Sequence, residues 1–453
     1  MVEKTTLRPF GYAQDRQAQD TTLGEEIMRR AAELLAKSTP RQMSQAVQEV
    51  VKKNEDWRGK QCINLLAPEA LISPTARKLL SSELCQRAGE GEIGDRWFAG
   101  TRYVDELEAL CVELAKKLFN CKYADQRLVA GMVCNMVVYF ALTEPGDVVM
   151  SIPKPLGGHS SNRFDGPAGA RGCQIVDVPF DPWEMTVDMD LFRKMVYLVR
   201  PRLVALGSTL TLFPYPLQEM AEIGQELGYQ IYFDGAHQLG LIAAGKFQDP
   251  LREGAIILTG STGKTLSGPQ GGIVLWDDEA ITERVRWAIF PGLAATHQIN
   301  RVAALAVSLA EMLEFGQEYM AQIVANSKAL GQALDERGFD VLCAHKGYSE
   351  THQVAVNVRE YGGGFQVAET LSQANIITNK NLTPDDTPAD WDTPSGIRLG
   401  TIEVTRLGMK EAEMAQIADF IHRVLVEKKA VAKVARDVAD FRQGFQKVHY
   451  CFD

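Results

Sequence analysis

Two short segments of the sequence carry residues that could do covalent chemistry on a small molecule. The first is Ser261-Thr262-Gly263-Lys264-Thr265, which stands directly before the glycine-rich turn 268–272. A lysine amine at the end of a strand can form a Schiff base, and glycines let backbone N–H groups approach a phosphate closely. A lone lysine of this kind is more often a solvated surface charge, so this segment needs a partner to be informative.

The partner is Asp234-Gly235-Ala236-His237, which follows the apolar run Ile231–Phe233. This position predicts a carboxylate at the mouth of a sheet. A single aspartate there would usually be a helix N-cap. A lysine and a carboxylate on neighbouring strands are, however, the minimal pair for pyridoxal 5'-phosphate, because the carboxylate keeps the pyridine nitrogen protonated and makes the ring an electron sink.

Both segments lie in a region that is typical of an α/β protein. From Val148 onward, short β-branched runs alternate with helical stretches; the runs are VVMSI, QIVDVPF, RLVALGS, QIYFDGA, AIILTGST and GGIVLW. This rhythm predicts a layered fold with a largely parallel sheet, in which ligands bind beyond the carboxyl ends of the strands. The polar strand ends Gly207-Ser208, Asp234-Gly235 and Ser261-Thr262 therefore mark the expected site.

The chain divides into three expected parts. Residues 1–60 predict an N-terminal helical arm of two helices, with a break at Ser38–Pro40. Residues 61–300 predict the large cofactor-binding domain, which includes an amphipathic helix over Arg102–Phe119. Residues 301–453 predict a long linking helix and a smaller C-terminal α/β domain with strands at FDVLCA, HQVAVNV and GIRLGT.

Composition narrows the class of ligand. The 453 residues carry a formal net charge of −10, which argues against nucleic acid or anionic lipid as the main partner. No stretch approaches the roughly 20 uncharged residues of a membrane span, and MVEKTTLRPF is not a signal peptide. Eight scattered cysteines without metal-binding spacing indicate reduced thiols, a cytoplasmic location and no metal site. We therefore expect a small-molecule ligand.

The two chemical segments also resemble those of a known family. TGSTGKTLSGPQGG is similar to the lysine segment of serine hydroxymethyltransferases, and YFDGAHQLGLIAAG is similar to their aspartate segment. The likeness continues, in order, through INLLAPEALISP, GDRWFAGTRYVDELE, KLFNCKYAD, IITNKN and SGIRLGTIEVTRLGM. The chain thus resembles a divergent member of this family.

This resemblance implies a fold type I pyridoxal phosphate enzyme of the α/β class. Its large domain would have a mostly parallel seven-stranded sheet, with a smaller C-terminal α/β domain beside it. The resemblance also implies a homodimer or a tetramer, with active sites shared between two chains. An amino acid is the implied substrate, and tetrahydrofolate is the implied co-substrate.

Roles on the cofactor side follow residue by residue from the resemblance. Lys264 matches the Schiff-base lysine, and Asp234 matches the residue paired with the pyridine nitrogen. His159 matches the histidine that stacks on the cofactor ring, and His237 matches the catalytic-site histidine beside the aspartate. Ser208 matches a hydroxyl near the phenolic oxygen of the ring.

Three further residues match the substrate side of the family's site. Arg398 matches the arginine that holds the substrate carboxylate, for which a guanidinium fork is suited. Glu90 matches the acid/base glutamate that handles the hydroxyl proton during cleavage of the carbon–carbon bond. Asn381 remains in the segment that binds the pteridine.

The phosphate-binding segment departs from the family's pattern. Ala130-Gly131-Met132 stands where the family typically has Ser-Gly-Ser. Phosphate binding is therefore expected to use backbone N–H groups at Gly131, together with Gly271 and Gly272 from a neighbouring chain.

Other departures surround the substrate. Apolar or small residues replace two tyrosines, a histidine and a serine of the family's pocket, and two polar residues replace leucines that sandwich the folate. Trp97 and Phe98 stand at the positions of the two tyrosines, and Ala88 stands at the position of a further tyrosine. Gly263 replaces the histidine, and Pro68 replaces the serine. Lys154 and Ser160 replace the two leucines.

The sequence therefore predicts chemistry at the Cα–Cβ bond of a serine-type amino acid, which includes a 2-methylserine type. Hydroxymethyl transfer with tetrahydrofolate is the leading form. The losses in the pocket leave open a folate-independent threonine aldolase or transaldolase. A third hypothesis, from another class, is a catalytically inactive binding or regulatory subunit.

Overall fold

The computed structural model describes residues 20–452, which form two compact units with a boundary after Gln61. The first unit consists of α1 (Asp20–Lys37), α2 (Pro40–Asn54) and a short π-helical turn (Glu55–Gly59). Thr39 caps α2, because its hydroxyl accepts a hydrogen bond from the backbone of the third helical residue. The predicted pair of helices with a break at Ser38–Pro40 is confirmed, whereas residues 1–19 of the expected arm lie outside the described residues.

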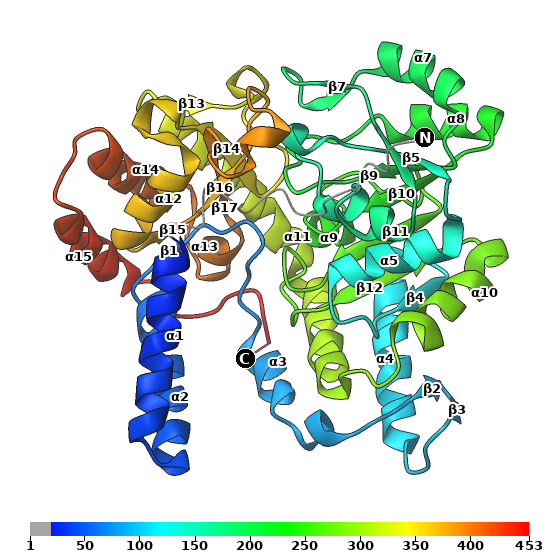
Figure 1. The fold of residues 1–453 in the computed structure, drawn as a ribbon, viewed down its shortest axis with the longest axis horizontal. Coiled ribbons are helices and arrows are strands. Elements are labelled where there is room, and N and C mark those ends of the chain that lie inside the picture. Colours follow the sequence, from blue (N-terminus) through cyan, green and yellow to red (C-terminus); the bar gives the residue numbers. More distant parts are fainter. Residues whose placement is uncertain (1–19, 453) are drawn as a thin grey trace, which may run out of the picture. The chain divides into compact units, whose positions relative to one another are not determined.

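A seven-stranded sheet forms the centre of the second unit (Figure 1). Only β12 runs against the other six strands. The strand order is β4 (Tyr123–Asp125), β12 (Gly272–Trp276), β11 (Ile257–Ser261), β10 (Gln230–Asp234), β9 (Leu203–Leu206), β5 (Val148–Ser151), β6 (Gln174–Asp177). The prediction of a mostly parallel seven-stranded sheet is confirmed, and each of the six predicted runs supplies a strand.

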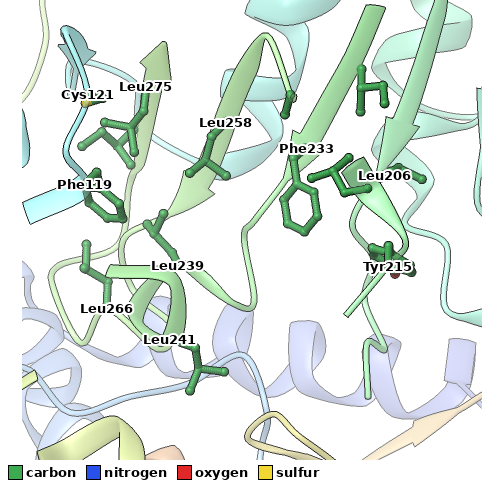
Figure 2. Packing of buried hydrophobic residues seen from close by; sticks show 14 of the residues in the cluster. Phe119, Cys121, Leu206, Tyr215, Phe233, Leu239, Leu241, Leu258, Leu266 and Leu275 are labelled. Atoms are coloured by element: carbon green, nitrogen blue, oxygen red, sulfur yellow. The ribbon is translucent and has the colours of Figure 1, made fainter. Parts of the chain in front are cut away.

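The sheet is buried on both faces, which is why its strands read as continuous apolar runs. Successive residues point to opposite faces, so Phe233 and Tyr232 enter different core clusters. Figure 2 shows Phe233 and Leu258 on neighbouring strands, in the same cluster as Leu239 of α9 (Leu239–Ala243). Removal of a buried phenylalanine side chain costs about 3–5 kcal/mol, so this packing fixes the strands firmly.

Helices cover both faces of this sheet and connect its strands. Tyr139 and Val138 of α5 (Gly131–Leu142) lie in the same core cluster as Tyr232, on one face. Elements of this region are α3 (Pro74–Leu80), α4 (Arg102–Phe119), α5 (Gly131–Leu142), α6 (Pro167–Ala170), α7 (Met189–Val199), α8 (Leu217–Leu227), α10 (Glu279–Trp287) and the hairpins β2 (Gly91–Glu92) with β3 (Asp95–Arg96) and β7 (Phe180–Asp181) with β8 (Thr186–Val187). The predicted amphipathic helix over Arg102–Phe119 is confirmed as α4.

A second, antiparallel sheet lies toward the C-terminus (Figure 1). Its order is β13 (Asp340–Val341), β14 (Gln353–Asn357), β17 (Gly396–Gly400), β16 (Asn379–Asn381). A parallel two-stranded pair lies nearby, and helices complete this region: β1 (Ile63–Asn64) with β15 (Ile376–Ile377), α12 (Gly363–Gln373), α13 (Ile402–Arg406), α14 (Glu411–Leu425) and α15 (Val431–Arg442). The three predicted C-terminal strands are confirmed.

The long helix α11 (Ile299–Asp335) contacts elements of both sheets' layers, including α4 and α14. Both sheets belong to one compact unit, so the division of this unit at residue 300 stays a prediction. Within residues 20–452, none of the helices combines the length and hydropathy that crossing a bilayer requires.

Candidate active site

Two adjoining cavities lie beyond the carboxyl ends of β9, β10 and β11. The larger has a volume of about 440 Å³ and the smaller about 150 Å³. They share five lining residues: Met132, His159, Thr209, His237 and Lys264. The position agrees with the strand ends that the sequence patterns marked.

Lys264 lies three residues after β11 and lines both cavities. Burial lowers the pKa of its amine to about 8; Asp234 opposes this shift and Arg398 adds to it. The next residue, Thr265, donates a hydrogen bond to the His237 carbonyl (2.8 Å). This hydrogen bond joins the lysine segment to the aspartate segment. With a pKa of about 8, roughly a tenth of the Lys264 amine is neutral near pH 7.

Asp234 ends β10, and its side chain is buried at the smaller cavity. Its Oδ2 accepts hydrogen bonds from the side-chain amides of Asn135 (2.7 Å) and Asn162 (3.3 Å), and Oδ1 accepts one from the Ala236 backbone (3.1 Å). The adjacent helix α9 begins only after Gln238, so Asp234 is not a helix N-cap. These three donors hold the carboxylate oxygens at a fixed place.

The turn after β9 allows this close approach. Gly207 has φ +89°, and a Cβ atom there would lie 2.0 Å from the Asp234 carbonyl oxygen. Only glycine therefore lets the two strand ends lie side by side. The following residue, Ser208, lines the smaller cavity, and its hydroxyl is hydrogen-bonded to the Leu210 carbonyl (2.8 Å) and to Thr211 Oγ1 (2.7 Å).

His159 reaches the cavities from the loop after β5, where its ring is held by Ser161. The Ser161 backbone N–H donates to Nδ1 (3.1 Å), so the ring proton of the neutral form is on Nε2. Burial lowers the pKa of His159, which favours this neutral form. Ser161 Oγ also accepts from Asn135 (2.7 Å), which connects His159 to the partners of Asp234.

The N-terminus of α5 borders the smaller cavity at Gly131 and Met132. Ala130 is the N-cap residue and forms no side-chain cap bond. The first backbone N–H groups of a helix have no partner inside the helix, and they attract anions. This end of α5 can therefore hold a phosphate without the hydroxyl groups that Ala130 and Met132 lack.

Arg398 lies on β17 and lines the larger cavity. Its Nη1 donates to the Thr209 carbonyl (2.5 Å), and Nη2 donates to Asn379 Oδ1 (3.3 Å). Burial lowers the pKa of this guanidinium to about 10. Within residues 20–452 its hydrogen-bond partners are carbonyl, amide and imidazole groups and no carboxylate, so a buried cation lines the cavity and can pair with an anionic ligand.

Asn381 lines the outer part of the larger cavity, together with Lys154, Ser160 and Trp391. Lys154 forms a salt bridge with Asp165, and its Nζ lies 5.2 Å from the centre of the Trp391 ring. Lys154 and Ser160, which stand where the family is expected to have leucines, thus line the cavity, and the wall that they form with Trp391 is polar and aromatic.

Glu90 is the predicted catalytic residue that the single chain does not bring to the cavities. It is half-buried, lines neither cavity, and accepts a hydrogen bond from Thr296. Gly271 and Gly272 also lie outside both cavities. The Gly272 N–H already donates to the Leu128 carbonyl (2.9 Å), in the loop between β4 and α5, so this amide is not available to a phosphate.

Several residues at the site were missed by sequence reasoning. Asn135 is an isolated polar residue in the otherwise apolar helix α5, and this contrast in the sequence could have marked it as a candidate site residue. His352 and Gln353 contact the ring of His237 from the start of β14. Only the pairing of β14 with β17 brings them close to Arg398.

Comparisons with known proteins identify the family of the chain. A family model described as serine hydroxymethyltransferase matches residues 41–421. The serine hydroxymethyltransferase of Methanocella arvoryzae is 48% identical over 389 residues, which cover 86% of this chain and 92% of that protein. Those of Methanocaldococcus jannaschii (44% over 412 residues; 90% and 95% covered) and Thermococcus kodakarensis (45% over 408 residues; 89% and 94% covered) are similar to the chain over the same extent. The chain therefore belongs to the serine hydroxymethyltransferase family of fold type I enzymes.

Proposed function

We propose that this chain is an active hydroxymethyltransferase that makes or breaks the Cα–Cβ bond of a serine-type amino acid. Pyridoxal phosphate is its proposed cofactor, and tetrahydrofolate is the proposed one-carbon carrier. The observation that carries the proposal is the meeting of Lys264, Asp234 and Arg398 at one pair of cavities, although they come from different strands and two sheets.

The residues present fit this cofactor. An amine with a pKa of about 8, a buried carboxylate held by two amides, and an open helix N-terminus border one small cavity. When it is bound, pyridoxal phosphate supplies an electron sink for negative charge at the substrate's α-carbon. Lys264 holds it covalently, Asp234 keeps a proton on its ring nitrogen, and the N–H groups of Gly131 and Met132 bind its phosphate.

The remaining residues bind and orient the amino acid. Arg398 pairs with the substrate carboxylate. This pairing offsets the free-energy cost of the buried guanidinium charge, which otherwise has no carboxylate partner. That grip decides which bond of the α-carbon is set for cleavage. Glu90 exchanges the hydroxyl proton in a homodimer, where it reaches the cavity of the neighbouring chain; its place outside the cavities of its own chain supports this arrangement.

A folate-independent aldolase or transaldolase is the second candidate, because Lys154 and Ser160 line the larger cavity where leucines are expected to hold folate. A 2-methylserine substrate fits the same altered wall. An inactive subunit is disfavoured, since the lysine, the carboxylate and the arginine all meet at one site.

The test is turnover by the purified holoenzyme of L-serine, 2-methylserine and L-threonine, each with and without tetrahydrofolate. The proposal expects cleavage of a serine-type substrate that depends on tetrahydrofolate. Threonine cleavage at a rate that does not depend on tetrahydrofolate would establish the second candidate instead. Bound cofactor without turnover of any of these amino acids would contradict both.

A further inference from the structure

The hydroxyl group of Tyr319 lies between the two segments that carry the lysine and the arginine of the site. Tyr319 stands on α11, is fully buried, and lines neither cavity. Its Oη atom is 3.1 Å from Oγ of Ser267, in the turn that follows Lys264. The same Oη atom is 3.1 Å from the carbonyl oxygen of Ile402, two residues after the end of β17. One side chain outside the cavities thus contacts both the lysine turn and the end of the strand that carries Arg398.

The directions of these two hydrogen bonds follow from the hydrogen atoms available. A phenol has one hydrogen and the Ile402 carbonyl can only accept, so Tyr319 donates to Ile402. The Tyr319 oxygen then accepts from Ser267, whose other acceptor, the Thr265 carbonyl, is farther away at 3.5 Å. Burial raises the pKa of Tyr319 to about 12, so the phenol keeps its hydrogen near neutral pH.

Ser267 closes the turn that follows the cofactor lysine. Its N–H donates to the Lys264 carbonyl (2.8 Å), and the N–H of Gly268 donates to the Thr262 carbonyl (2.9 Å). Ser267 has φ +56°, in the left-handed region that a residue with a Cβ atom rarely adopts. Such a backbone conformation persists only where surrounding contacts hold it. The hydrogen bond from the buried Ser267 side chain to Tyr319 is a contact of this kind.

The ring of Tyr319 is itself held by a residue close to the C-terminus. Tyr450 stacks on it, with ring centres 4.9 Å apart and planes 20° apart. The guanidinium of Arg406 lies 5.1 Å from the centre of the Tyr319 ring, and its Nη1 donates to the Tyr450 carbonyl (2.5 Å). Arg406 also pairs with the buried Glu311 of α11 (3.2 Å). The Tyr319 hydroxyl therefore has a fixed position on α11.

The two ends of this connection differ in how they are supported. The end of β17 has a second hydrogen bond to α11, from Thr401 Oγ1 to the Ile323 carbonyl (2.9 Å). Within residues 20–452, only the Tyr319 hydroxyl forms a hydrogen bond between α11 and the lysine turn 264–268. Loss of this hydroxyl should therefore release the lysine turn and leave β17 in place.

We infer that Tyr319 is a positioning residue, whose hydroxyl sets the turn of the cofactor lysine relative to the strand of the carboxylate-binding arginine. This inference rests on the proposed function. A displacement of about 1 Å at a reacting group can cost about a hundredfold in rate. Release of the turn should therefore lower kcat, whereas binding of the amino acid at Arg398 should be kept.

The kinetic test is a double-mutant cycle on the two hydroxyl groups. Tyr319→Phe keeps the stacked ring, and Ser267→Ala removes the other end of the same hydrogen bond. We expect kcat to fall about tenfold in each single variant and no further in the double variant, with KM for the amino acid changed less than about twofold. Losses that multiply in the double variant, or an unchanged kcat in Tyr319→Phe, overturn the inference.

The matched control is Tyr348→Phe. The Tyr348 hydroxyl also bonds to α11, at Asp335 (2.9 Å), but this contact is exposed and lies outside both cavities. The control variant should keep the kcat of the wild type. A loss of kcat in Tyr348→Phe equal to that in Tyr319→Phe overturns the inference, because any hydroxyl on α11 would then have the same effect.

A second measurement does not depend on turnover. Amide hydrogen exchange of the full-length apoprotein, measured by mass spectrometry on a peptide that covers residues 264–270, should be about fivefold faster in Tyr319→Phe and in Ser267→Ala. A role in packing alone predicts a lower unfolding temperature with unchanged exchange in this peptide, and that result overturns the inference. Ser267→Ala decides the question by itself if Tyr319→Phe does not fold. Wild-type protein that forms no covalent bond with the cofactor overturns the proposed function, and the exchange rates then decide this inference.

Discussion

The two cavities differ in how their polar groups are held. Asp234 and Asn135 line the smaller one, and hydrogen bonds that join them to each other and to the buried Ser161 fix the orientation of each side chain. In the outer wall of the larger one, the largely buried Lys154 pairs with Asp165 and the Trp391 residue is 44% exposed. Groups that hold a constant cofactor gain from fixed geometry, whereas a wall with one ion pair and a partly exposed ring is less tightly connected and can change with less effect on the fold.

The departures from the family's pattern follow the same division. Lys154, Ser160 and Pro68 all line the larger cavity, and none of them lines the smaller one. Ala88, Trp97, Phe98 and Gly263 line neither cavity, and at Ala130-Gly131-Met132, beside the smaller cavity, backbone N–H groups at a helix end replace lost hydroxyls. The comparison therefore predicts severe effects of substitution at the inner cavity and mild effects at the outer wall.

Lys264→Ala should produce the largest effect, because it removes the covalent anchor of the cofactor. We expect activity to fall by about three orders of magnitude or more. Borohydride reduction of the wild-type holoenzyme, followed by peptide mass spectrometry, should find the cofactor on Lys264. Lys154→Ala is the matched control, since this lysine lines the outer wall and should leave the attachment intact. Cofactor found on another lysine would contradict the assignment.

Asp234→Asn should lower kcat by about a hundredfold, because a neutral amide cannot hold a proton on the ring nitrogen. Asp177→Asn is a suitable control, since Asp177 also ends a strand of the same sheet but lies on the surface beside Arg163. Equal kcat values for Asp234→Asn and the wild type would place the essential carboxylate elsewhere.

Arg398→Ala should raise KM for the amino acid about thirtyfold, as expected for the loss of a charged hydrogen-bonded pair. The KM of Arg398→Lys should lie between those of the wild type and Arg398→Ala, because an ammonium keeps the charge but loses the bidentate fork. Steady-state kinetics at saturating cofactor measures both. An unchanged KM in Arg398→Ala would remove this residue from the substrate site.

Covalent attachment of the cofactor to the apoprotein should depend on pH through Lys264. The nucleophile is the neutral amine, and burial lowers its pKa to about 8. The attachment rate should therefore rise about tenfold per pH unit below 8 and level off above it. Stopped-flow absorbance measures this rate. A rate that keeps rising to pH 10 would show that Lys264 retains the pKa of an exposed lysine.

The smallest effect should come from the outer wall. The double substitution Lys154→Leu with Ser160→Leu restores apolar side chains where the family is expected to hold folate, and we expect tetrahydrofolate to bind about threefold more tightly. Lys116→Leu, a change at a surface lysine of α4, is the control. Weaker binding in the double variant would indicate that the polar wall itself recognises the carrier.

Sequence reasoning predicted much of the fold and of the inner cavity. Apolar runs that end in polar residues located β9, β10 and β11, and the same ends located Ser208, Asp234 and Lys264. The physical reason is that strands of a parallel sheet end at one edge, so local patterns are enough to bring their last residues together.

The tertiary structure decided the rest. Asn135, Gln353 and His352 reach the site by helix packing and by the pairing of β14 with β17, which no local pattern reveals. Gly272 shows the reverse case, since a glycine beside the lysine segment donates its N–H to the Leu128 carbonyl in the loop after β4 and not to a ligand. Residue types by themselves determined the kind of chemistry and the strands that carry it. Only the assembled chain determined which donor faces which acceptor, because hydrogen bonds between distant segments depend on angles and distances that packing alone sets.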